Sequence, residues 1–195
     1  MTTSHNYNNN IKEAFKHQWT LSSKKELFIH DYITQNTINL TPTFIGLGAG
    51  TDEYIDHKDQ PADHVKGTAD IFIPQTNTYI EITGPNVQVH ENDSIWINSI
   101  KLNNSYTKLK QDPTSSHIVV HFNTNFKNIT TIRIVPINKT FFDNAHKYKI
   151  IKPKISNINF KFIALNPNAF PVLPFSSLIP SIIKNNISAY TKLLP

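Results

Sequence analysis

The stretch KGTADIFIPQTNTYIEITG, residues 66–84, predicts a β-hairpin and constrains the fold more than any other part of the chain. Side chains of opposite character alternate with a period of two along 68–73 and again along 78–83, which is typical of β-strands. The four residues between them, PQTN, are of the types that favour a tight turn. The sequence therefore predicts two antiparallel strands closed by a short connection.

The two faces of this hairpin differ in chemistry. Pairing across the turn places Asp70 opposite Glu81, with Cβ atoms ~5 Å apart. Two carboxylates this close repel each other unless a cation lies between them or one is protonated, and oxygen ligands suit Mg²⁺ or Mn²⁺. The other face is apolar and needs to be covered by a core; it consists of Ile71, Ile73, Ile80 and Ile82. The pattern predicts either a metal site or a surface hairpin with two solvated acids.

Length and composition exclude several classes of protein. The 195 residues suffice for one domain with a core of its own. The sequence has no apolar run of ~18 residues, and its first residues, MTTSHNYNNN, lack the apolar centre of a signal peptide. It also has no cysteine, which excludes disulfides, thiolate catalysis and cysteine-based zinc sites. We therefore expect an intracellular protein of the cytoplasm or nucleoid, neither secreted nor bound to a membrane.

Charge is distributed unevenly along the chain. Residues 1–112 contain nine lysines and thirteen acidic residues, a net charge of −4, whereas residues 113–195 contain ten basic residues and one acid, a net charge of +9. An acidic half suited to cations is thus joined to a basic half suited to polyanions, of which nucleic acid is the first candidate. A basic surface that only maintains solubility is the alternative.

The remaining sequence predicts helices and strands around the hairpin. Helical spacing and capping residues favour two helices before it and one after it, and apolar runs favour three further strands. The glycine-rich stretch GLGAGTDEY lacks the Lys-Ser/Thr of a phosphate-binding loop, so we interpret it as a flexible connection or a bulge. The expected helices are 11–21, 24–36 and 95–110, the last of them capped by Asp93 or Ser94, and the expected strands are 43–47, 117–123 and 129–137.

The ends of the chain are expected to differ from this core. Residues 1–10 are polar and predicted to be disordered, and 11–137 form the core domain. Residues 138–195 are expected to form a basic extension packed on the same domain, irregular over 138–175 and helical over 176–194. Aromatic residues alternate with lysines in this extension, as they do on nucleic-acid-binding surfaces. We therefore predict phosphate contacts from Lys147, Lys149, Lys152 and Lys154; solvated lysines over a core of aromatics are the alternative.

From residue 26 to residue 137 the order of elements resembles that of the restriction-endonuclease-like, PD-(D/E)XK, nuclease superfamily. Asp70 in GTADIFI matches the Asp of the family motif, and Glu81 in YIEITG matches its Glu. The resemblance implies an α/β (α+β) fold in which helices flank a central mixed sheet. It also implies a Mg²⁺- or Mn²⁺-dependent endonuclease that cuts DNA and that forms a homodimer in many members.

The resemblance further implies roles for individual residues. Asp70, Glu81 and the backbone carbonyl of Ile82 would hold the metal, and Glu26, less readily Glu13, would be the acid of the first helix. The family has a lysine two residues after the Glu, and here that position is Thr83. Four explanations stay open: Lys66 replaces it, Lys101 replaces it, the threonine itself serves, or the protein is inactive and only binds.

Overall fold

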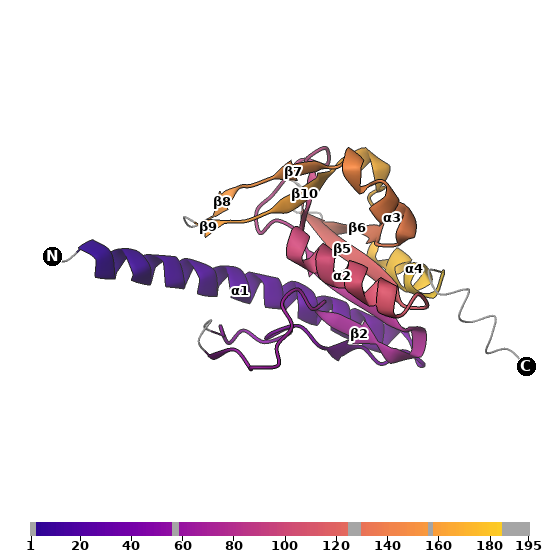
Figure 1. Ribbon diagram of the computed structural model, residues 1–195. Coiled ribbons are helices and arrows are strands. Elements are labelled where there is room, and N and C mark those ends of the chain that lie inside the picture. The colour runs from indigo at the N-terminus through magenta and orange to yellow at the C-terminus, as the bar shows by residue number, and fades with distance from the viewer. Residues whose placement is uncertain (1–2, 56–58, 125–129, 156–157, 185–195) are drawn as a thin grey trace, which may run out of the picture.

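The computed structural model describes residues 3–55, 59–124, 130–155 and 158–184 (Figure 1). It is a mixed α/β structure in which helices flank a central mixed sheet, as expected from the sequence. No helix of the described residues is both long and apolar enough to cross a membrane.

The central sheet has the strand order β1-β2-β3-β5-β6. Strands β3 and β5 are parallel, and the other three neighbouring pairs are antiparallel. Strand β6 lies at one edge of this order, which suits Pro136 at its end. The strands are β1 (Thr43–Phe44), β2 (Ile71–Ile73), β3 (Thr78–Thr83), β5 (Ser116–Thr124) and β6 (Thr130–Pro136).

Helices α1 (Thr3–Asn36) and α4 (Leu178–Lys184) contribute to the core on one face of this sheet. Their buried residues pack against the isoleucine face of the hairpin and against the alternate residues of β5 and β6. Figure 1 shows the first half of α1 extending past the sheet on the left. The buried helical residues in this core are Ile29, Ile33, Leu178 and Ile182.

The other face of the sheet carries a second core. Helix α2 (Ser99–Gln111), helix α3 (Lys139–Asp143) and a three-stranded sheet pack there against Val119 and Val135. The small sheet has the order β4-β10-β7 and consists of β4 (Ile95–Asn98), β10 (Phe162–Leu165) and β7 (Lys149–Ile151). Beside it, β8 (Lys154–Ile155) pairs with β9 (Ile158–Asn159).

The hairpin has the predicted register. Ile73 pairs with Thr78 and Phe72 with Tyr79, and a short 3₁₀ turn (Pro74–Thr76) followed by Asn77 connects the strands. Asn77 adopts the left-handed conformation with φ 46°, which an asparagine tolerates in a turn. Strand β2 is shorter than expected, because pairing begins only at Ile71.

The first helix corrects two expectations. One continuous helix replaces the two that we expected, and it begins at Thr3, within the segment that we expected to be disordered. Residues 3–36 contain neither glycine nor proline to interrupt it. The hydroxyl of Ser23 donates to the carbonyl of Thr20 at 3.1 Å, so this serine bonds back along the helix and does not cap a new one.

The segment after the hairpin also differs from the expectation. Residues 95–98 form strand β4, and the helix starts at Ser99 rather than at Ile95. Ile95 and Ile97 are buried on either side of the exposed Trp96, so the period here is two. Asn98, not Asp93 or Ser94, caps α2 by accepting a hydrogen bond from the amide of Ile100 at 2.9 Å.

The C-terminal third contains more regular structure than expected. Segment 138–175 includes helix α3 and two strands of the small sheet, where we expected an irregular extension. Alternation of buried and exposed residues is weak in these short strands, which hid them in the sequence. Of the helix expected over 176–194, α4 covers Leu178–Lys184, and 185–195 lie outside the described residues.

Candidate functional site

Lys101 joins the two carboxylates of the hairpin. Its Nζ lies 3.1 Å from Oδ1 of Asp70 and 2.8 Å from Oε2 of Glu81, and it also donates to the carbonyl of Thr68 at 2.8 Å. The side chains of Asp70, Glu81 and Lys101 are 10%, 15% and 26% exposed. The two acids therefore share one largely buried cation, as their predicted proximity required.

Backbone hydrogen bonds fix Asp70 in this position. Its amide donates to the carbonyl of Ile80 at 3.0 Å, which continues the hairpin pairing one residue beyond β2. Its Oδ2 accepts from the amide of Ile82 at 2.7 Å. The amide of Ile45, just after β1, donates to the carbonyl of Asp70 at 2.9 Å. One carboxylate oxygen is thus used for positioning, and Oδ1 faces Lys101.

Glu26 on α1 adds a third carboxylate to this region. Its Oε2 accepts a hydrogen bond from the amide of Gly50 at 2.8 Å. Gly50 has φ +74°, and a side chain there would collide with the ring of Phe44, which lies 2.5 Å from an ideal Cβ. The glycine-rich segment is therefore a turn packed on its neighbours, and it holds Glu26 through a backbone donor.

Burial and mutual repulsion raise the pKa values of these acids. Burial, followed by the charge of Asp70, raises the pKa of Glu81 to about 8 and that of Glu26 to about 7. Burial opposes the charge on Lys101, but the charges of Asp70 and Glu81 outweigh it, so the Lys101 pKa is raised above its ordinary value. Asp70 and Glu81 thus share Lys101, whereas Glu26 interacts with both Lys25 and Lys101.

Asp70 and Glu81 are the candidate metal ligands of this site. Among the described residues, no three His, Cys, Asp or Glu side chains are close enough to hold an ion together. Mg²⁺ commonly uses only one or two carboxylates and completes its shell with water and phosphate. Lys101 marks the point between Asp70 and Glu81 where a cation is already stabilised. Asp70 and Glu81 are thus the two carboxylates that a divalent cation would have to use, in competition with Lys101.

Lys101 reaches the acids, whereas Lys66 does not. Lys66 lies exposed in a turn, and because β2 begins only at Ile71, the even strand spacing that suggested it does not apply. In the described structure no ion pair connects Lys66 to either carboxylate. Thr83, at the motif position of the lysine, ends β3 and lines a separate pocket.

That pocket, of about 650 Å³, was not expected from the sequence. It begins at Thr83 and includes His121, which pairs with Thr83 across β3 and β5. His117 lies further back on β5, stacked on Tyr79 at 4.7 Å and within 3.1 Å of the Ser115 hydroxyl, which fits a structural role.

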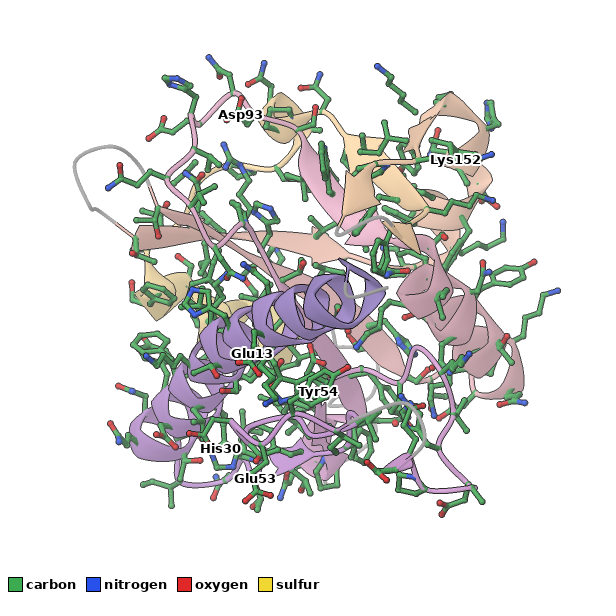
Figure 2. The ribbon with its side chains drawn as sticks, turned by 90° about the vertical axis from the view of Figure 1, so that its left-hand side faces the viewer. Glu13, His30, Glu53, Tyr54, Asp93 and Lys152 are labelled. Atoms are coloured by element: carbon green, nitrogen blue, oxygen red, sulfur yellow. The ribbon has the colours of Figure 1, made fainter. Side chains whose placement is uncertain are left out.

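Among the described side chains, no ion pair joins the lysines of the C-terminal third to Asp70 or Glu81. Lys149 is on β7, and Lys147 and Lys152 flank this strand; all three are exposed. Lys147 donates to the Asn144 side chain at 2.8 Å. Figure 2 shows Lys152 at the upper right of the molecule. The side chain of Lys154 lies outside the described ones.

Comparison with known proteins did not identify the chain. No protein-family model, no curated protein and no solved structure matches it.

Proposed function

We propose that this protein is a metal-dependent endonuclease that hydrolyses phosphodiester bonds of DNA. The single observation that carries the proposal is the position of Lys101, whose ammonium lies within 3.1 Å of one oxygen of Asp70 and one of Glu81. Two carboxylates can hold a metal ion beside a phosphate, and a lysine next to them can neutralise a phosphate oxygen.

The order of elements supports a restriction-endonuclease-like core. A helix precedes an antiparallel β1-β2-β3 unit, α2 connects β3 to the parallel strand β5, and β6 follows antiparallel. Asp70 lies one residue before β2 and Glu81 lies in β3, close to the positions that the PD-(D/E)XK resemblance implies. The small sheet β4-β10-β7 is an addition to that pattern.

Asp70 and Glu81 would hold Mg²⁺ or Mn²⁺ together with the carbonyl of Ile82. The amide of Ile82 points at Asp70, and the N–H and C=O of one strand residue point to the same side, so this carbonyl faces the same space. The bound ion would activate a water molecule and stabilise charge on the phosphate.

Lys101 replaces the lysine that the motif has at position 83. An ammonium on α2 reaches the carboxylates from the helix side, whereas Thr83 has no positive charge to offer. Its role would be to neutralise a phosphate oxygen as negative charge develops there. Glu26, whose pKa is raised to about 7 by burial and by Asp70, is suited to exchange a proton near neutral pH.

One observation favours a second candidate, an inactive nuclease-fold protein that only binds nucleic acid or a protein. The cavity beside Glu81 and Lys101 has a volume of only about 10 Å³, less than a water-filled active site needs. If Lys101 never leaves this position, the ammonium takes the place of the metal permanently.

The test is incubation of the purified protein with supercoiled plasmid in Mg²⁺, Mn²⁺ or EDTA. We expect nicking with either metal and none in EDTA. Asp70→Ala and Glu81→Ala should each abolish cleavage while DNA binding in EDTA persists. Glu53→Ala, which removes an exposed acid outside the site, is the matched control and should cleave normally. Absence of cleavage by the folded wild type with both metals would support the binding protein instead.

A further inference from the structure

The pocket at the end of β3 lies directly beside the carboxylates. Thr83 follows Glu81 by two residues on the same face of the strand, a separation of about 7 Å. The pocket volume of about 650 Å³ is in the range of sites that enclose a small organic ligand. A group bound here would thus lie about one nucleotide away from a phosphate held at Asp70 and Glu81.

Aromatic and aliphatic side chains form the walls of this pocket. Trp96 on β4 and Phe162 on β10 both line it, with ring centroids 6.0 Å apart and planes inclined by 43°. Trp96 is 43% exposed and Val87, on the opposite loop, is 69% exposed. Such exposure of a tryptophan beside an aliphatic side chain leaves a flat apolar surface free for stacking.

Polar side chains of β5 lie on another side of the pocket. His121 and Asn123 both line it, and they are only 5% and 2% exposed. Nδ1 of His121 is shielded from water and has no hydrogen-bond partner among the described residues. His121 and Asn123 thus place hydrogen-bonding groups in the wall of an otherwise largely apolar pocket.

The side chains that line the pocket make a phosphate a poor occupant. Of the described residues that line it, none is lysine or arginine, and Asp93 contributes a carboxylate. Burial, with the nearby charges of Arg133 and Lys25, lowers the His121 pKa to about 4, so the imidazole is neutral and offers one donor and one acceptor. The pocket suits a neutral, flat group with a hydrogen-bonding edge.

The loop that forms one wall is held in place before any ligand binds. Lys25 on α1 donates to the carbonyls of Gly84 and Pro85 at 2.8 and 3.0 Å and to the Asn86 side chain at 2.6 Å. Gly84 has φ +134°, and an ideal Cβ there would lie 2.5 Å from the carbonyl oxygen of Phe122. A preformed wall lowers the entropy lost on binding.

We propose that this pocket receives one unpaired nucleobase, stacked against Trp96 and Phe162 and contacted at its edge by His121. The substrate is then single-stranded or locally opened DNA, such as a flap or a bubble, because a base in continuous duplex cannot enter. The inference rests on the proposed function for the phosphate next to the base, but base binding is measured without cleavage.

The experiment measures binding in EDTA by fluorescence anisotropy, with a labelled 12-nucleotide single strand and a blunt duplex of the same sequence. We expect the single strand to bind at least tenfold more tightly. Trp96→Ala should weaken single-strand binding about ten- to a hundredfold. Tyr106→Ala, which removes an aromatic side chain with the same 43% exposure on α2, should change it less than twofold.

Trp96→Phe guards against a folding defect, since it keeps a stacking ring and should restore binding to within about fivefold of the wild type. Equal affinity for single strand and duplex, or equal losses in Trp96→Ala and Tyr106→Ala, would overturn the inference. A protein that shows the expected preference but never cleaves retains the base pocket and refutes the hydrolase. A protein that cleaves duplex and single strand alike retains the hydrolase and refutes the base pocket.

Discussion

The two faces of the central sheet differ in what their buried residues do. The face towards α1 and α4 carries Ile71, Ile80 and Ile118, each at most 1% exposed, in a continuous apolar core. The face towards α2 carries Asp70, Glu81 and His121, and burial destabilises the charged forms of Glu81 and His121. The period of two in each strand separates these two sets completely along β3.

This difference indicates where the sequence serves stability and where it serves function. Burying an isoleucine contributes about 2–3 kcal/mol, whereas a buried ion pair contributes little net stability and is often replaceable by apolar residues. A hydrophobic α2 face would make the fold more stable, so the acids and Lys101 there fit a site retained for binding or catalysis.

Removing the ammonium of Lys101 should destabilise the protein through the polar face of the sheet. In Lys101→Met, Asp70 and Glu81 lose the ammonium that both contact, so we expect the free energy of unfolding to fall by about 3–5 kcal/mol. Urea unfolding measures this loss. Mg²⁺ at millimolar concentration should restore more stability to this variant than to the wild type.

Lys110→Met is the control, because Lys110 is on the same helix but exposed and should change stability by less than about 0.5 kcal/mol. If Mg²⁺ stabilises Lys101→Met no more than the wild type, the two carboxylates do not form a cation site.

A cavity on the apolar face should affect stability without affecting the site. Ile80 is fully buried, and Ile80→Ala is expected to lower the free energy of unfolding by about 3 kcal/mol. Its pH dependence of stability should stay parallel to that of the wild type, because the acids lie on the opposite face. A pH profile that changes shape would show that the two faces are coupled.

Neutralising Glu81 should stabilise the protein at alkaline pH. Its pKa is raised from 4.5 to about 8 by burial and by Asp70, so the folded state binds more protons than the unfolded state between these values, and stability falls as pH rises through this window. Glu81→Gln removes this loss, and we expect a gain of about 1–2 kcal/mol at pH 8–9.

Thermal unfolding between pH 5 and 9 measures this gain. Near pH 5 the two proteins should be about equally stable, since Glu81 is protonated in the folded wild type. Glu26 also has a raised pKa and keeps a smaller slope in the variant. A variant that is less stable than the wild type at pH 9 would mean that attraction to Lys101 outweighs the repulsion by Asp70.

Local patterns predicted the hairpin well because it is closed by its own turn. The alternation and the PQTN connection fixed both the register and the proximity of Asp70 and Glu81. Lys101 was one of two lysines that the sequence suggested, and strand length decided against Lys66. The pocket beside Thr83 depends on the pairing of β4 with β10. In this pair Phe162 lies opposite Asn98, 64 residues earlier in the chain, and no local sequence pattern predicts such a contact.

Replacing lysines of the basic half should have the smallest effect on stability. It should instead change the salt dependence of nucleic-acid binding. Lys147, Lys149 and Lys152 are exposed around β7, which belongs to the same small sheet as Trp96. Each phosphate that a lysine neutralises steepens the salt dependence of binding by roughly 0.9 in log–log slope on B-DNA and ~0.7 on a single strand. Replacing these three and Lys154 by Gln should therefore make the slope shallower by up to about 3–4. Each change should alter stability by at most about 0.5 kcal/mol.

Lys139→Gln combined with Lys184→Gln is the matched control, because both lysines are basic residues outside β7 and β8. It should leave the slope nearly unchanged. Metal binding at Asp70 and Glu81 should be equal in all of these variants, since none of the described lysine side chains around β7 contacts the acids. If the quadruple variant keeps the wild-type slope and its circular dichroism spectrum, these lysines are only solvated. Phosphate contacts would then have to come from α2, where Lys108 and Lys110 lie on the helix that also carries Lys101.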